Sequence, residues 1–296
     1  MSERVSLVMV PVDGSPSAAA ATRHAAMLAR LLDARLQLLH VMPLNPPELS
    51  DVPANRQADS DHDRALCQHT ASEALRLARE AIQPPMATPP EEVTLEDATF
   101  VRHPARIIVA HAQRQPDCLL VIGARHLSDM GKFVEGSVSN EVVHRASFPV
   151  TVVHAESAEE DAQRIDRVLL PVDGSRHSDK AAALAGDLAR SAEASVALLF
   201  CRPASEAADD GNMDDETRHI FHRARQALGE IPAGVTERVL CTTHYADAIT
   251  AEARRHADHP MIIMGSRGLG TWREALLGSV SHRVIDRASC PVTVVV

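Results

Sequence analysis

The residues with the clearest chemical meaning are three glycines and a serine near the end of the chain, Gly265, Gly268, Gly278 and Ser279. They form the pattern Gly-x2-Gly-x9-Gly-Ser directly after a short apolar run. Glycine lets the backbone approach an anion because it has no Cβ, and the first N–H groups of a helix are free donors at the positive end of its dipole. The stretch that starts at Ser279 is compatible with a helix. The pattern therefore predicts a phosphate-binding loop.

The motifs that must position this loop occur twice along the chain. Residues 10–15 recur at 170–175, residues 136–139 at 278–281 and residues 148–153 at 290–295. The offset is 160 residues for the first motif and 142 for the second, so the first copy carries 18 additional residues in its middle. A repeat of this length indicates tandem domains and not a solenoid, whose repeats are roughly 20–50 residues long. We expect one domain over 1–155, called the first half below, and another over 156–296, called the second half.

Apolar runs and helical spacing predict the same order of elements in both halves. Each half begins with a short apolar run that is typical of a buried parallel strand. The expected first helices start at Ser15 and at Ser178, and further strands are expected at 118–122, 150–153, 261–264 and 292–295. Alternation of strands and helices predicts an α/β fold, with a parallel sheet covered by helices on both faces.

The 18 additional residues of the first half lie between Met42 and Val93. Residues 43–61 and 84–92 are rich in Pro, Asp and Asn, so we expect a surface loop there. The alternative is a lid or a loop that docks a partner. The acidic, alanine-rich stretch from His154 to Gln163 is expected to link the two halves.

Composition excludes several classes of protein. A formal net charge of −10 with 2% aromatic residues argues against nucleic-acid binding, because that function needs an excess of Lys and Arg and rings for base stacking. The sequence shows neither a membrane-spanning run nor a signal-peptide core, so we expect a soluble cytoplasmic protein. The five cysteines form no Cys-x2-Cys pair and are expected to be reduced and buried.

Taken together, these motifs resemble the universal stress protein family in its tandem two-domain form. The resemblance covers almost the whole chain, and its most specific element is the glycine pattern at 265–279. It implies two doubly wound, five-stranded parallel sheets with strand order 3-2-1-4-5. It also implies ATP as the ligand, with Mg²⁺ carried on the phosphates, and a non-enzymatic role in the stress response. The two fifth strands would pair and hold the halves together as an intramolecular pseudo-dimer, whereas the competing arrangement is a homodimer that pairs these strands between chains.

The implied strand order places the candidate site. In an open parallel sheet the ligand crevice lies at the carboxyl ends of the strands, where the strand order reverses. That point falls between the first and fourth strands, where Asp173 and Gly265 converge. By resemblance, Asp173 would face the adenosine, and the glycines and serines would hold the ribose and phosphates. The expected site residues of the second half are Pro171, Val172, Asp173, Met264, Gly265, Gly268, Gly278, Ser279, Val280 and Ser281.

The first half departs from the pattern at one position, where His126 replaces the second glycine. A side chain there could close the approach to phosphate, although an imidazole could also donate a hydrogen bond to an anion. We therefore expect the two halves to bind nucleotide unequally, with the stronger site in the second half. The first-half positions in register with the motif are Asp13, Gly123, Gly136, Ser137 and Ser139.

Other functions remain open or are disfavoured on the residues. The glycines follow the fourth strand and not the first, which disfavours a Walker loop or a dinucleotide fingerprint. Cys241 and His244 have a ligand-like spacing, but no second Cys/His pair stands nearby to complete a metal site. His282 next to Ser281 makes a poor nucleophile and base, because adjacent helical residues point in different directions. A slow ATP hydrolase and a nucleotide-free interaction scaffold remain as alternatives.

Overall fold

Strands and helices alternate along both halves of the chain. The structure is a computed structural model that describes residues 4–43, 53–97, 104–124, 138–154, 164–203, 214–255, 259–267 and 277–296. The first half contains β1 (Leu7–Pro11), α1 (Pro16–Leu32), β2 (Arg35–Pro43), α2 (Pro53–Ala81), β3 (Glu91–Asp97), α3 (Pro104–Ala112), β4 (Cys118–Ala124), α4 (Val138–Arg145) and β5 (Val150–His154). The second half contains β6 (Arg167–Pro171), α5 (Arg176–Ala192), β7 (Ser195–Arg202), α6 (Asp215–Leu228), β8 (Val235–Cys241), α7 (Tyr245–Arg255), β9 (Pro260–Gly265), α8 (Ser279–Arg287) and β10 (Val292–Val295).

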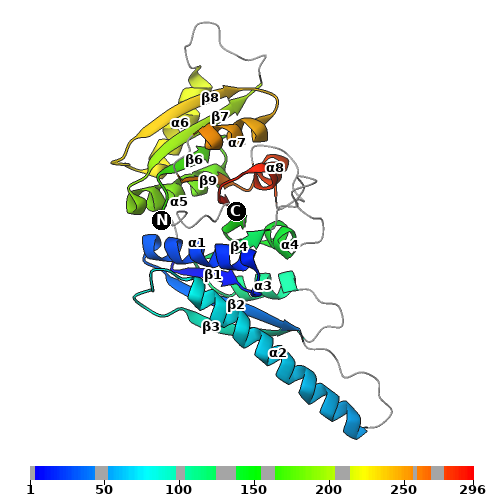
Figure 1. Cartoon of the computed structure of the whole chain (residues 1–296). Helices are drawn as coiled ribbons and strands as arrows, with labels where there is room; N and C mark the ends of the chain where they lie inside the picture. The colour runs from blue at the N-terminus through cyan, green and yellow to red at the C-terminus, as the bar shows by residue number, and fades with distance from the viewer. Residues whose placement is uncertain are drawn as a thin grey trace.

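All these strands belong to one sheet, with the order β3-β2-β1-β4-β5-β10-β9-β6-β7-β8 (Figure 1). Neighbouring strands are parallel within each half, and only β5 and β10 are antiparallel, where the halves meet. Each half therefore has the order 3-2-1-4-5. The expected α/β fold with two doubly wound parallel units is confirmed.

The two fifth strands pair edge to edge, as predicted. Residues Val292 and Val294 of β10 stand opposite Val152 and Val150 of β5. Between them the hydroxyls of Thr151 and Thr293, both fully buried, form a hydrogen bond of 2.7 Å. Because β10 also pairs with β9, neither fifth strand leaves its edge open to solvent.

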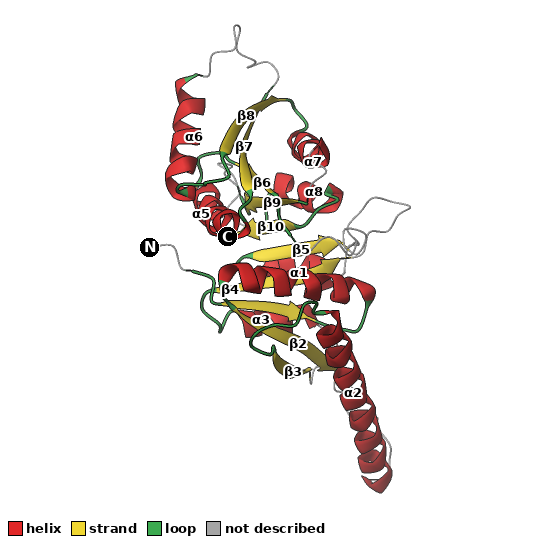
Figure 2. Cartoon of the chain, turned by 60° about the vertical axis from the view of Figure 1, so that its left-hand side comes forward, coloured by secondary structure: helices red, strands yellow, loops and turns green. Residues whose placement is uncertain are grey.

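Helices cover both faces of the sheet. Apolar residues of α1, α2, α5 and α6 pack on one face, and those of α3, α4, α7 and α8 pack on the other (Figure 2). Side chains alternate along each strand, so Val8 of β1 enters the first core and Met9 enters the second. Each core contains residues from both halves. The halves therefore share their hydrophobic cores as well as their sheet.

The first helix of the second half begins earlier than predicted. Its N-cap was predicted at Ser178. The N-cap of α5 is instead Ser175, whose hydroxyl accepts the N–H of Ser178 at 3.2 Å. Gly174 turns the chain with φ of +75°, a conformation that glycine adopts without strain. The equivalent Ser15 caps α1 as predicted and accepts the N–H of Ala18 at 3.2 Å.

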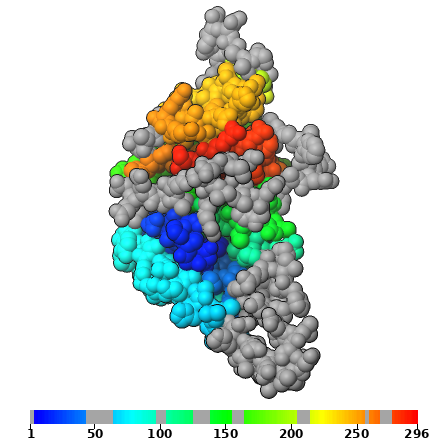
Figure 3. All heavy atoms as spheres, turned by 45° about the vertical axis from the view of Figure 1, so that its right-hand side comes forward, coloured from blue at the N-terminus to red at the C-terminus, as the bar shows by residue number. Residues whose placement is uncertain are grey.

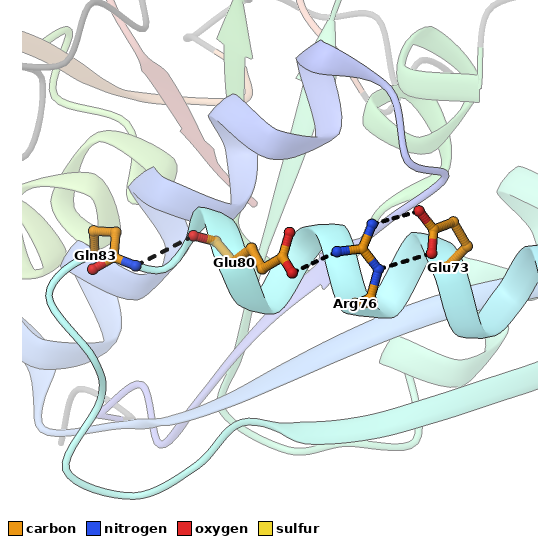
Figure 4. A network of polar contacts seen from close by, with 4 residues as sticks. All are labelled: Glu73, Arg76, Glu80 and Gln83. Carbon is orange, nitrogen blue, oxygen red and sulfur yellow. Dashed lines mark hydrogen bonds and ion pairs between the residues drawn. The ribbon is translucent and has the colours of Figure 1, made fainter.

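The insertion of the first half lengthens a helix, which corrects the prediction of a surface loop for residues 53–61, while residues 44–52 lie outside the described residues. Helix α2 begins at Pro53 and has 29 residues, whereas its counterpart α6 has 14. Proline is tolerated in the first turn because its N–H would have no helical partner. Along the exposed side of α2, Arg76 pairs with Glu73 and Glu80, each at 2.5 Å (Figure 4). Solvent-exposed pairs of this kind add little to stability, so α2 depends mainly on the apolar residues near its end.

Three smaller expectations are tested by the same elements. His154, expected in the linker, is the last residue of β5, and its Nε2 lies 2.9 Å from the carbonyl oxygen of Ile285. Cys118 and Cys290 are buried as predicted, but Cys241 is exposed because it ends the edge strand β8. Among the helices in the described ranges, none is long and apolar enough to cross a membrane.

Acid should destabilise the protein through a buried histidine of α1. Burial lowers the pKa of His24 from 6.5 to about 4, and no described residue bonds its Nε2. Below pH 6.5 the unfolded chain takes up a proton that the folded chain resists, so stability is lost as the pH falls from about 6.5 to 4. The loss amounts to at most about 3–4 kcal/mol, because each unit of pKa is worth about 1.4 kcal/mol.

Leu184 takes the place of His24 in α5, so His24→Leu copies the residue of the other half. Urea unfolding at several pH values should show that the free energy of unfolding of this variant falls less steeply with decreasing pH than that of the parent. The control is His222→Gln, which changes an exposed histidine of α6 and should leave the slope unaltered. If the pH dependence of the unfolding free energy is the same in His24→Leu and the parent, other groups dominate the loss of stability in acid.

Candidate functional site

The two motifs of the predicted second-half site meet at the carboxyl ends of β6 and β9. These strands are parallel neighbours, with Leu169 opposite Ile262. Asp173 follows β6 after one intervening residue, and Gly265 is the last residue of β9. The convergence that the sequence analysis inferred from the implied strand order is therefore present. Figure 1 shows α5 and α8, the helices that follow these two strands.

Hydrogen bonds tie the start of α8 to the end of β9. The N–H of Gly278 donates to the carbonyl oxygen of Ser266 at 2.7 Å. The buried hydroxyl of Ser281 donates to the carbonyl oxygens of Gly265 at 3.0 Å and Ser266 at 3.3 Å. Ser281 therefore acts on the backbone of the loop, which fixes where the first turn of α8 lies.

The first turn of α8 leaves backbone donors available to an anion. Gly278 is the N-cap and has no side chain to accept their hydrogen bonds. The next N–H with a helical acceptor is that of His282, which donates to the carbonyl oxygen of Gly278 at 3.0 Å. Ser279 is exposed, and the C-terminal segment that includes α8 (red) reaches the surface in Figure 3. A phosphate placed here would meet free N–H groups and the positive end of the helix dipole.

Asp173 closes the tight turn between β6 and α5. Its Oδ1 accepts the N–H of Ser175 at 3.0 Å, and its own N–H donates weakly to the Ser178 hydroxyl at 3.4 Å. The Ser175 hydroxyl lies 3.3 Å from the carbonyl oxygen of Arg267, to which it donates. The turn after β6 and the loop after β9 are thus held together by a direct bond.

Basic side chains, which the sequence analysis did not single out, gather at the same place. Burial, and then the charges of Arg267 and Lys180, lower the pKa of His177, whereas Asp173 acts in the opposite direction. The Arg267 carbonyl oxygen accepts the hydroxyl of Ser175, the N-cap of α5. Lys180 donates to the carbonyl oxygen of Val296 at 2.8 Å. Arg267 stands inside the glycine pattern, so its position was the signal that could have identified it.

The first glycine of the pattern has a packing role that the sequence alone did not reveal. A Cβ on Gly265 would lie 2.9 Å from the backbone carbon of His177 at the start of α5. A Cβ on Gly123 would lie well under 3.0 Å from the backbone of Ser17 at the start of α1. In both halves this glycine lets the fourth strand approach the first helix, so it faces protein backbone.

Alanine at these glycines should therefore destabilise the fold. Because the clash is with backbone that cannot rotate away, we expect a loss of about 1–3 kcal/mol. Gly123→Ala should lose more stability than Gly265→Ala, since its Cβ would approach the neighbouring helix more closely. Urea unfolding of both variants measures the difference. Equal stability to the parent would show that the strand and helix can separate at little cost.

The remaining second-half positions lie along the same edge. Pro171 ends β6, Val172 is buried directly after it, and Met264 is buried in β9. Val280 packs partly against the core on the α8 face. Gly268 lies outside the described residues. Among the described residues, no group of three Cys, His, Asp or Glu side chains is arranged to hold a metal ion, so Cys241 and His244 gain no support as ligands.

His282 is engaged elsewhere, so it does not support a nucleophile and base pair. Its Nδ1 lies 3.2 Å from Asp286, and this hydrogen bond raises the pKa of His282. Its ring also contacts that of His144 in α4 across the joint between the halves, with centroids 5.3 Å apart and the planes tilted by 42°. Ser281 meanwhile donates to backbone carbonyls.

Comparison with known proteins decides the family. The model for the universal stress protein family matches residues 6–154 and again residues 164–296. The chain belongs to the universal stress protein family. A universal stress protein of Mycolicibacterium smegmatis is 29% identical over 301 residues, which cover 97% of this chain and 96% of the relative. One from Mycobacterium tuberculosis is 27% identical over 296 residues, which cover 97% and 95%.

A solved structure shares the two-half architecture. The universal stress protein of Archaeoglobus fulgidus aligns with a TM-score of 0.67 and 23% identity, covering 98% of this chain and 97% of that chain. At this identity the likeness supports the fold alone. It agrees with the tandem form that the repeated motifs predicted for this universal stress protein.

The first half of this universal stress protein places its motif residues similarly, as far as they are described. Oδ1 of Asp13 accepts the N–H of Ser15 at 2.9 Å, and Gly123 lies in β4, next to β1. Ser139 is buried in the first turn of α4. Gly136, Ser137 and the substituted His126 lie outside the described residues.

Proposed function

We propose that the second half binds ATP, with Mg²⁺ carried on the phosphates, and that the protein responds to this ligand in the stress response of the cytoplasm. The observation that supports the proposal most strongly is the uncapped first turn of α8. Gly278 provides no side-chain cap for the first N–H groups of α8, and the loop that precedes this helix is bonded through Arg267 and Ser175 to the turn after β6, at the point where the strand order reverses. Arg267 adds a positive charge to the loop after β9, where its carbonyl oxygen accepts the Ser175 hydroxyl.

A role for Mg²⁺ as a counterion of the phosphates fits the side chains that are present. The described residues offer no carboxylate cage, whereas Mg²⁺ commonly binds through substrate phosphates and water. Asp173 is the carboxylate of this edge, and one of its oxygens is already engaged by Ser175. The residues that would hold the nucleotide are therefore backbone donors of α8 together with the basic side chains.

We also propose that the halves act as domains with bounds 1–155 and 156–296, and that the second half holds the stronger site. The first half carries His126 at the position of the second glycine. A pseudo-dimer of this kind needs no second chain to complete the sheet, because β5 and β10 already pair with each other. Native mass spectrometry would report the number of bound nucleotides and the oligomeric state together.

Titration calorimetry with Mg-ATP tests the proposal. We expect about one nucleotide per chain with the affinity set by the second half. No heat at millimolar ligand would reject nucleotide binding and favour an interaction scaffold. Release of phosphate in stoichiometric excess, lost in Gly278→Val, would instead identify a slow ATP hydrolase. A non-enzymatic role predicts that bound ATP is recovered intact.

A further inference from the structure

The second half carries a buried arginine where the first half has an apolar residue. Met42 of β2 and Arg202 of β7 hold equivalent positions in the repeat, and both are buried. Arg202 is 8% exposed, although a charged side chain loses favourable hydration when it is removed from water. Because Met42 fills the same position in the first half, the fold itself does not require a charge there. The reason for the arginine therefore lies among its own neighbours.

The helix that follows β7 uses one part of the guanidinium. Nη1 of Arg202 donates to Oδ2 of Asp214 at 2.6 Å, while Oδ1 of Asp214 caps α6 by accepting the N–H of Thr217 at 2.7 Å. The Nε of Arg202 is buried and has no hydrogen-bond partner among the residues that the structure describes. A buried donor without a partner costs free energy, so this nitrogen would gain from one more acceptor.

The neighbouring strand brings the thiol of Cys241 to this arginine. Arg202 and Cys241 are partners in the register of β7 and β8, so their side chains project from the same face of the sheet; Figure 2 shows the two strands side by side. A hydrogen bond with the Cys241 side chain is the largest cause that raises the pKa of Arg202, and burial acts in the opposite direction. Cys241 is exposed, unlike Cys118 and Cys290.

A thiol in this position combines two properties of reactive cysteines. The thiolate is the nucleophile, and a cation beside the sulfur favours it, while exposure admits an oxidant. The nearby Cys201 does not share this position. Side chains alternate along β7, so Cys201 projects from the opposite face and packs against the core there. The product of oxidation at Cys241 is therefore not a disulfide with Cys201.

We propose that Cys241 is a redox-modification site, at which hydrogen peroxide oxidises the thiol to a sulfenic acid and the guanidinium of Arg202 stabilises the reacting sulfur. The thiolate sulfur attacks one peroxide oxygen, so an S–O bond forms as the O–O bond breaks, and the electron pair of that bond leaves with hydroxide. The proton that the thiol released converts hydroxide to water. Sulfur is oxidised and peroxide is reduced. The unpartnered Nε is a donor for the oxygen that sulfur gains, and none of these steps depends on nucleotide binding.

Trapping with dimedone, which labels sulfenic acids, tests the proposal on the full chain. After a brief exposure to hydrogen peroxide, peptide mass spectrometry should show that Cys241 reacts roughly tenfold faster in the folded protein than in the same protein unfolded in urea. A thiol that is merely exposed gains no reactivity from folding. Equal or slower reaction in the folded protein would overturn the proposal.

Two variants assign the effect to the arginine. Arg202→Met copies the first half and should slow the reaction of Cys241 roughly tenfold. The matched control is Asp214→Asn, which keeps a good N-cap residue for α6 and leaves Arg202 in place, so the rate should stay within about threefold of the parent. A folded Arg202→Met protein that reacts at the parent rate would remove the arginine from the proposal. If Arg202→Met does not fold, the comparison of folded and unfolded parent still decides whether Cys241 is the site.

Discussion

Gly278→Val should remove Mg-ATP binding without unfolding the protein, with a loss of affinity of at least a hundredfold. A Cβ at this position would lie 3.1 Å from the carbonyl oxygen of Ser266, so the two branches of valine must project from the first turn of α8. They would cover the N–H groups that are proposed to hold the phosphates. The φ of −78° at Gly278 suits any residue, so the backbone itself should not be strained.

The matched control is Gly136→Val, the same change in the first half. It should leave the affinity for Mg-ATP within about twofold of the parent, since the stronger site is proposed to lie in the second half. Calorimetry measures binding, and urea unfolding checks that both variants are folded. If Gly278→Val binds as tightly as the parent while Gly136→Val does not, the first half carries the site and the proposed asymmetry is reversed.

Deleting residues 291–296 should cause aggregation or separate the halves. The deletion removes β10, which lies inside the sheet between β9 and β5, and it exposes two apolar strand edges at once. Exposed edges of this kind pair with other chains. Small-angle scattering should therefore show either large particles or a chain that has lost its compact two-half form.

A milder variant tests the pairing of β5 with β10 without deleting a strand from the second half. Thr293→Lys keeps β10 but places a charge opposite the buried Thr151, which is unfavourable because an unpaired charge resists removal from water. The control is Val296→Ala, just beyond β10, which should stay compact. A truncated chain that remains compact, soluble and as heat-stable as the parent would show that β5 and β10 are not what joins the halves.

The elements that the sequence predicted well are those whose own residues carry the signal. β6 and β10 are apolar runs, and the N-cap at Ser15 follows from a serine before an alanine-rich stretch. The pairing of the two fifth strands could be inferred because Val292–Val295 would be a hazard at an open edge, although their antiparallel direction was not predicted. The convergence of Asp173 and Gly265 followed from strand order, which the family resemblance supplied.

The features that were missed depend on distant contacts or on polar segments. The first turns of α2 are rich in Pro, Asp and Asn, and they carry no apolar stripe that would distinguish a helix from a loop. The packing role of Gly265 depends on how closely α5 approaches β9. The contact of Arg202 with Cys241 joins residues of two different strands, so neither partner reveals it alone.

The antiparallel pairing of β5 with β10 also decides which way each half faces. All strands of one half run parallel, so its carboxyl-end edge, where the candidate site lies, is at one rim of the sheet, and that of the other half is at the opposite rim. The rims are separated by at least the length of a strand, roughly 15 Å for five residues. Ligands at the two rims therefore cannot touch, and any cooperativity between them has to be transmitted through the shared sheet and cores. In the terms of linkage, a nucleotide at one rim changes affinity at the other only if the sheet itself has two states.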